Sequence, residues 1–320
     1  MLLPFLECSA TYEVVKPFRI PAHPGSLWRG VIGRTLRREG CAKLNVCAGS
    51  CGLPKECLYS RLFDPVVPNP PPHRFLRGQQ EVPPPLLPLV GWSGNARLEK
   101  GATVRMGLRC LGRWTEREQH VLGNVLRMIP NALLGRDEGR VELVSVSEPV
   151  SDEQAACARD CLAMDRDSFS MEVRLVTPLW MEQEGRLLTE LSFSRLFTDV
   201  MRRLTVLCSL YGVHDPDDDA NFSALRAVAS EVRVRKSRLC PLHWERHSLE
   251  TDERHPLHGV LGEVTLEGPL APLVPFLRLA EVAHVGKATS FGLGRLQITR
   301  FPNAHDRETA NGTARWKEIG

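Results

Sequence analysis

The fold is decided by the stretch SFSRLFTDVMRRLTVLCSLY, which spans residues 192–211. Its apolar side chains, from Phe193 to Tyr211, recur at spacings of three and four residues. This spacing is typical of an amphipathic helix, because it gathers the apolar side chains on one side. The stretch therefore predicts a long helix with one buried face, and Arg202 and Arg203 lie on its polar side.

The segments around this helix predict the element order β-α-β-β-α-β for the second half of the chain. Residues 169–176 alternate between apolar and polar side chains, as a strand with one buried face does. After the helix come strand-like segments at 231–238 and 259–267, a helix at about 271–284 with Pro272 in its first turn, and a last strand at 294–300.

The first half predicts the same order. Thr115 and Glu118 have the spacing of a capping box, which marks the start of a helix running to about Leu134. The other predicted elements are a strand at 8–18, a helix at 25–39, strands near 86–92 and 103–111, and a strand at 140–147. Two copies of this order predict an α+β fold of two tandem ferredoxin-like domains.

We expect an N-terminal domain at residues 1–150 and a C-terminal domain at residues 165–302. The first would carry an insertion at residues 41–88, which contains four clustered cysteines and a proline-rich segment. Residues 303–320 are polar and lack periodicity, which predicts a flexible tail.

The composition places the chain among ordinary folded proteins. Its 320 residues are enough for two domains of about 150 residues each. With 42% apolar and 25% charged residues it is neither disordered nor collagen-like. It has no run of about 18 apolar residues that would span a membrane, and its start, MLLPFLECSATYE, lacks the basic region of a signal peptide. We therefore expect a cytoplasmic protein without a membrane partner.

The charge by itself does not identify a partner. The 41 basic and 38 acidic residues give a net charge of +3, which is too small to indicate nucleic-acid binding unless the basic residues cluster.

Four of the ten cysteines fall close together, at Cys41, Cys47, Cys51 and Cys57. Four thiolates can close a tetrahedral zinc site, so we expect one structural zinc ion here. Unligated thiols, or another metal or cluster, remain the alternatives. A catalytic metal is not expected, because four cysteine ligands leave no open coordination position.

A glycine-rich loop, GKATSFGLGR at residues 286–295, joins the last predicted helix to the last strand. Its three glycines allow the backbone to approach a ligand closely, and Lys287 and Arg295 would suit a polyanion. The alternative is a tight connection between helix and strand. The pattern is neither a Walker loop nor a dinucleotide fingerprint, because a helix precedes it and a strand follows.

In this position, the loop resembles that of the RAMP superfamily of CRISPR-associated proteins, and in particular its endoribonucleases that cut precursor CRISPR RNA. LGEV at 261–264, AHV at 283–285 and LWRGVIGRTLRR at 27–38 extend the resemblance. YSRLF at 59–63, just after the cysteine cluster, fits one branch of that family.

The resemblance implies an endoribonuclease that matures CRISPR repeat RNA into guide RNA without a metal cofactor, and that keeps its product bound. Other CRISPR effector subunits would then be its partners. One alternative is a non-catalytic RAMP subunit that holds guide RNA in an effector complex. A more distant alternative is a metal-stabilised protein-interaction module.

Metal-independent RNA cleavage uses the 2′-hydroxyl as nucleophile and leaves a 2′,3′-cyclic phosphate. It needs a proton acceptor, a proton donor and cations near the phosphate. The family often places a histidine near its first helix, and His23 matches here, with Arg29, Arg34 and Arg38 as charge-stabilising groups. The alternatives are a solvated loop histidine and the solvated side of an amphipathic helix, while His284 with Lys287 is a third option.

Further residues are candidates for RNA contacts through phosphate or base stacking. They are Arg37, Arg202, Arg203, Arg233 and Arg235, together with Gly286, Lys287, Ser290, Phe291, Gly292, Gly294 and Arg295 of the loop.

Overall fold

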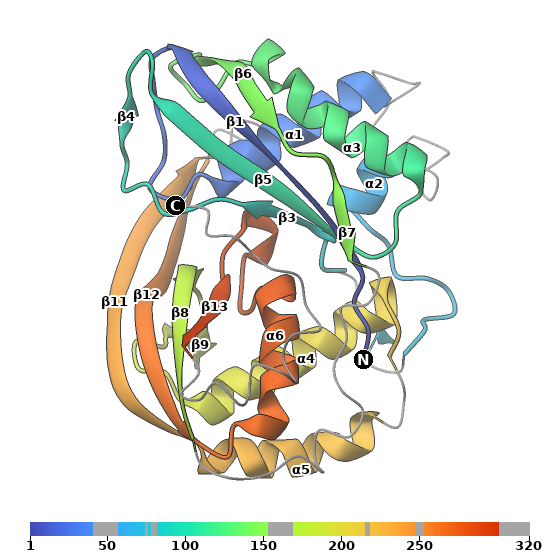
Figure 1. Ribbon diagram of the computed structural model, residues 1–320, viewed down its shortest axis with the longest axis vertical. Helices are drawn as coiled ribbons and strands as arrows, with labels where there is room; N and C mark the ends of the chain where they lie inside the picture. Colours follow the sequence, from blue (N-terminus) through green and yellow to red (C-terminus); the bar gives the residue numbers. More distant parts are fainter. Residues whose placement is uncertain are drawn as a thin grey trace.

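The computed structural model describes residues 1–40, 57–73, 76–77, 82–152, 169–214, 218–247 and 253–300. Each half of the chain forms an antiparallel sheet with helices packed against it, which confirms the expected mixed α+β fold (Figure 1). The predicted tail and most of the cysteine cluster lie outside the described residues.

In the first half, the sheet has the strand order β3-β5-β1-β6, and β7 also pairs with β1. Helices α1 and α3 pack on it around a core that contains Tyr12, Trp28 and Leu126. The elements are β1 (Phe5–Lys16), β2 (Phe18–Arg19), α1 (Gly25–Gly40), α2 (Leu58–Phe63), β3 (Leu86–Leu89), β4 (Arg97–Leu98), β5 (Thr103–Leu111), α3 (Glu116–Met128), the 3-10 helix η2 (Ile129–Asn131), β6 (Arg140–Val146) and β7 (Val150–Asp152).

In the second half, the sheet has the strand order β11-β12-β8-β13 and packs against α4 and α6. The stretch quoted above is α4, and its apolar side is buried as its spacing predicts. The elements are β8 (Phe169–Leu179), β9 (Glu182–Gln183), β10 (Arg186–Leu187), α4 (Phe193–Tyr211), α5 (Asp218–Glu231), β11 (Arg233–His247), β12 (Arg254–Gly268), η4 (Ala271–Leu273), α6 (Val274–Ala283), η5 (Thr289–Phe291) and β13 (Leu296–Arg300).

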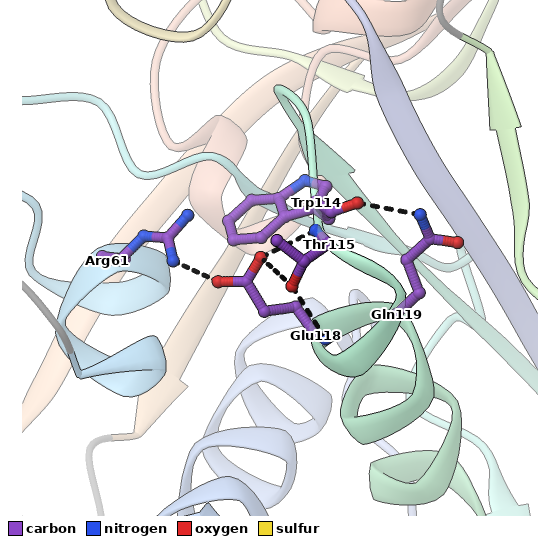
Figure 2. A network of polar contacts seen from close by, with 5 residues as sticks. All are labelled: Arg61, Trp114, Thr115, Glu118 and Gln119. Carbon is purple, nitrogen blue, oxygen red and sulfur yellow. Dashed lines mark hydrogen bonds and ion pairs between the residues drawn. The ribbon is translucent and has the colours of Figure 1, made fainter.

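The capping box of α3 is confirmed. The Glu118 amide donates to Thr115 Oγ1 at 3.3 Å, and the Glu118 carboxylate accepts from the Thr115 amide at 2.8 Å. Arg61 of α2 forms an ion pair with the same carboxylate and lies over the Trp114 ring at 5.0 Å (Figure 2). The start of α3 therefore also anchors α2 on the first half.

The hairpin β11–β12 is longer than the sequence predicts. Expected strands of eight or nine residues extend to fifteen residues each. Before Val260, β12 has no pairing with β8 and pairs with β11 alone, so residues 241–247 and 254–259 form a two-stranded ribbon. We call this ribbon the hairpin tip. Pro241 and Pro256 argue against strands in the sequence, but prolines are tolerated where only one neighbour strand pairs.

Helix α5 is a second departure from the sequence prediction, which contained no helix between α4 and β11. Its residues show weak apolar periodicity, with Leu225, Val228 and Ala229 as its buried side chains. This helix adds to the layer formed by α4 and α6, and leaves the sheet order unchanged.

Candidate functional site

Three segments from the two halves meet where the sequence analysis placed the site. The start of α1, the glycine-rich loop and the hairpin tip come together around a small apolar cluster that includes Ala22, Trp244 and Leu293. The approach at Gly25 is so close that a Cβ atom there would lie 1.7 Å from the carbonyl oxygen of Phe291. Segments far apart in the chain thus share one surface, which we call the seam.

The glycine-rich loop is a tightly bonded connection. Gly292 and Gly294 have positive φ angles of 81° and 73°, and a Cβ at Gly294 would lie 1.7 Å from the Val285 carbonyl oxygen. The Lys287 amide donates to the Trp180 carbonyl and the Gly294 amide to the Pro178 carbonyl, at 2.8 and 2.9 Å. The close approach that requires glycine is therefore to the protein's own backbone.

The side chains of the loop differ in what they offer a ligand. Lys287 is exposed, whereas Ser290 and Phe291 are half-buried. Arg246 of β11, which sequence reasoning missed, lies over the Phe291 ring at 4.8 Å. Arg295 is largely buried in a charged cluster with Glu7, Arg109 and Glu281, so it faces the contact between the two halves.

His23 lies at the seam but inside the protein. Its side chain is 2% exposed and its ring centroid is 6.2 Å from that of Trp244. Burial lowers the pKa of His23 to about 4, so the imidazole is neutral at pH 7. The expectation of a solvated loop histidine is therefore wrong, and the ring holds no extra proton to donate at neutral pH.

The arginines of α1 fall into two sets. Arg29 and Arg37 face α2: the first lies 4.5 Å from the Phe63 ring centroid and the second 4.1 Å from that of Tyr59. Arg34 and Arg38 are exposed on an adjacent side of the helix. The structure thus separates the four residues that the sequence grouped, and only the second set is directed to solvent.

Two other candidate positions have structural partners. Arg203 donates from Nε to the carbonyl oxygens of Ala283 and His284, at 2.9 and 2.7 Å, so it caps the end of α6. This corrects its expected place on the solvated side of the helix, because its guanidinium is buried; Arg202 is exposed. His284 is fully buried, which removes the third option for proton transfer.

Strand β11 is the edge strand of its sheet and carries exposed basic side chains (Figure 1). Arg233, Lys236 and Arg238 are exposed, and Arg235 pairs with Glu267 at 2.7 Å. The register shifts between Val234 and Lys236, so Arg233 and Arg235 do not alternate regularly as the sequence analysis assumed.

We predict that changing both Arg233 and Arg238 to alanine weakens RNA binding in a salt-dependent manner. Removal of one phosphate neighbour should reduce the slope of log K against log salt by about 0.7–0.9. The measurement is binding of labelled RNA at several salt concentrations. Arg127→Ala, an exposed arginine of α3 in the first half, is the control and should leave the slope unchanged. Equal slopes for all three proteins would exclude β11 from the interface.

A carboxylate-centred cluster on the other face of the hairpin was missed by the sequence analysis. Glu182 accepts hydrogen bonds from Trp180 Nε1 at 2.7 Å and from His258 Nε2 at 3.3 Å, and it forms an ion pair with Lys287. The hydrogen bonds from Lys287, Trp180 and His258 lower the pKa of Glu182 to about 2. No sequence motif signals the cluster, because its members come from separate strands, the segment between β8 and β9, and the loop.

A hollow of about 560 Å³ lies elsewhere, beside the network of Figure 2. Its lining includes Arg61, Trp114, Tyr211 and several prolines, and none of the site residues predicted from the sequence. The candidate site is therefore a surface at the seam, and this hollow is not part of it.

Comparisons with solved structures report the fold of relatives. The chain superposes on a Cas6 (TTHB231) product complex with a TM-score of 0.55 and 17% identity, covering 92% of this chain and 100% of the other. It superposes on a Cas6 (TTHA0078) product complex with a TM-score of 0.50 and 15% identity over the same shares. A partial Cas6-RT-Cas1–Cas2 complex matches with a TM-score of 0.54 and 14% identity, covering 93% of this chain and 46% of the other.

Comparisons of sequence identify the family. A search of curated proteins finds no significant match. Residues 3–166 match the family described as AF_1859_N, N-terminal domain, and residues 173–296 match the family described as CRISPR-associated endoribonuclease Cas6. Together the two matches include α1, the hairpin and the glycine-rich loop. The chain therefore belongs to the CRISPR-associated, RAMP-fold family of Cas6 repeat-processing endoribonucleases.

Proposed function

We propose that this protein cuts CRISPR repeat RNA at the seam, by attack of the RNA's own 2′-hydroxyl, and keeps the product bound. The observation that carries the proposal is the convergence of α1, the glycine-rich loop and the basic hairpin within a chain of the Cas6 family. The two Cas6 relatives described above were solved as product complexes, and a further one as a substrate mimic complex. Among the described residues, no helix is long and apolar enough to cross a membrane.

In this proposal, the RNA backbone follows the basic edge of β11 toward the loop. Arg34, Arg38 and Lys287 are exposed and supply cations, whose charge stabilises the developing phosphorane. No metal is needed for this chemistry, because the nucleophile is part of the substrate and proton transfer is done by side chains.

His23 can serve as the proton acceptor only if its ring becomes accessible. With 2% exposure, this requires Trp244 and the hairpin tip to move away from the start of α1. Arg29 could then act only through its contact with α2, since its guanidinium donates to the Phe63 carbonyl at 3.2 Å.

The test is incubation of the purified protein with a panel of CRISPR repeat RNAs in EDTA. We expect cleavage at one position, a 2′,3′-cyclic phosphate on the upstream product, and no cleavage when the nucleotide before the cut carries a 2′-deoxy substitution. Binding of the deoxy RNA should be retained, because phosphate contacts dominate affinity. Cleavage of the deoxy RNA would rule out the 2′-hydroxyl as nucleophile.

The burial of His23 supports a second candidate, a RAMP subunit that holds guide RNA without cutting it. This alternative needs the basic surfaces and no proton-transfer group. Tight binding of repeat RNA without cleavage, across the whole panel, would favour it over the endoribonuclease.

We further propose one structural zinc ion in the cysteine cluster. Cys57, the member that the structure describes, is half-buried directly before α2, while Cys41, Cys47 and Cys51 lie outside the described residues. Elemental analysis of protein purified without added metal should give about one zinc per chain, as four thiolates require. Cys57→Ser should lower this value, whereas Cys240→Ser, at an exposed cysteine of β11, should not. Wild-type protein without zinc would mean that the thiols are unligated.

A further inference from the structure

The cluster around Glu182 contains the groups that metal-independent RNA cleavage needs, and the sequence analysis did not include it among the catalytic candidates. Two histidines lie side by side on the hairpin, since His243 and His258 are paired across β11 and β12 with ring centroids 6.1 Å apart. Lys287 of the glycine-rich loop joins them through its ion pair with Glu182. Strand pairing and the loop bring the three groups together from separate positions in the chain.

These histidines differ from His23 in accessibility. The side chain of His258 is 27% exposed and His243 is exposed, whereas His23 is 2% exposed. The neighbouring pair of the hairpin, Trp244 and Leu257, is buried in the seam. Because successive strand residues point to opposite faces, His243 and His258 lie on the other face of the hairpin from His23.

Glu182 orients the imidazole of His258. When His258 Nε2 carries the proton and donates it to Glu182 Oε1, over the observed 3.3 Å, Nδ1 has a free electron pair that can accept a proton. The carboxylate also stabilises the imidazolium that forms after that transfer, as in other carboxylate–histidine pairs. Trp180 fixes the arrangement from the side, because its ring lies 4.4 Å from the imidazole and its Nε1 donates to the same carboxylate.

We propose that His258 is the proton acceptor and His243 the proton donor of the cleavage reaction, with Glu182 as a positioning residue. This inference rests on the proposed function. His258 Nδ1 takes the proton of the 2′-hydroxyl while the 2′ oxygen forms a bond to phosphorus. The bond from phosphorus to the 5′ oxygen breaks, and protonated His243 gives its proton to that oxygen. One proton is taken up and one released, and no redox partner is required.

Other charged groups surround the pair. Lys287 lies beside Glu182 and is 56% exposed, so it can contact a phosphate oxygen. Arg195 of α4 reaches the backbone carbonyl of Glu182 at 3.5 Å and pairs with Asp199 at 3.4 Å. The local charge therefore favours an anionic substrate next to the two histidines.

The experiment measures single-turnover cleavage of a repeat RNA that the wild-type protein cuts, with enzyme in excess. His258→Ala and His243→Ala should each slow cleavage by about 10²–10⁴-fold, the range for losing a positioned acid or base. RNA affinity should stay nearly unchanged. Free imidazole added to His258→Ala should restore part of the rate, which a merely structural role would not allow.

The matched control is His255→Ala. This histidine also lies on β12 and faces a carboxylate, but its Nε2 lies 3.7 Å from Glu253, whereas the partner of His258 is Glu182. The variant should cleave at the wild-type rate and show no response to imidazole. Glu182→Gln should shift the acidic limb of the pH–rate profile to lower pH, because the imidazolium of His258 is then without the carboxylate that stabilises it.

The outcomes separate this inference from the function. A cutting wild-type protein whose rate is unchanged in His258→Ala overturns the inference and leaves the endoribonuclease standing. The same holds if His23→Ala alone abolishes cleavage. If the wild-type protein cuts no repeat RNA, the function and the inference both fall. Should His258→Ala unfold, His258→Gln provides the same comparison, because its amide can still donate to Glu182.

Discussion

Arg109→Ala is expected to lower the free energy of unfolding by about 3–5 kcal/mol, the usual effect of breaking a buried ion pair. Arg109 donates to Glu7 from Nε and Nη2 at 2.9 and 2.7 Å, and both side chains are buried. Its Nη1 also donates to the carbonyl oxygens of Glu281 and Val282, at the end of α6 in the other half. The change would leave Glu7 as a buried charge and remove a link between the two halves. Urea denaturation measures the destabilisation.

The control for Arg109 lies on the same strand. Arg105 of β5 is exposed, so Arg105→Ala should change the free energy of unfolding by less than about 1 kcal/mol. The double change Glu7→Leu with Arg109→Met should recover a large part of the stability, because it removes both buried charges. If Arg109→Ala destabilised the protein no more than Arg105→Ala, the pair would not hold the halves together.

Gly25→Ala is expected to disrupt the seam. Its Cβ would lie 1.7 Å from the Phe291 carbonyl oxygen and 2.8 Å from His23 Cε1, so the loop or the start of α1 must move. Overpacking of this kind costs about 1–3 kcal/mol. We also expect weaker RNA binding and slower cleavage, since Phe291 and Lys287 belong to the displaced loop. Thermal unfolding and single-turnover cleavage measure the two effects.

The same helix provides the opposite case. At Gly30, a Cβ would meet nothing closer than the end of the Arg34 side chain, at 3.5 Å. Gly30→Ala should therefore stabilise the protein by up to about 1 kcal/mol, because alanine favours the helix interior. If Gly25→Ala were as stable and active as Gly30→Ala, the contact between α1 and the loop would have no functional weight.

Most elements could be predicted because their signals are local. The spacing in α4 and the capping box of α3 involve residues within a few turns of one another, and both are confirmed. Alternation in β5 and β8 likewise reports one strand at a time. The hairpin tip was missed because its strands contain prolines and are held by each other alone, so no buried face imposes a regular apolar pattern.

The candidate site divides in a similar way. The glycine-rich loop and the basic residues of α1 stand out in the sequence, and so does the resemblance to CRISPR repeat-processing enzymes. Whether a basic side chain faces solvent could not be read from its position: Arg202 and Arg203 are neighbours, yet one is exposed and the other caps α6.

The sequence by itself determined the α+β class, the order of most elements and the family. Tertiary structure alone decided which histidine is buried, which arginines are paired, and that Glu182, His258 and Lys287 share one cluster. The physical reason is the range of the interactions. Periodicity and capping act over a few residues, whereas burial and ion pairing depend on segments that only the folded chain brings into contact.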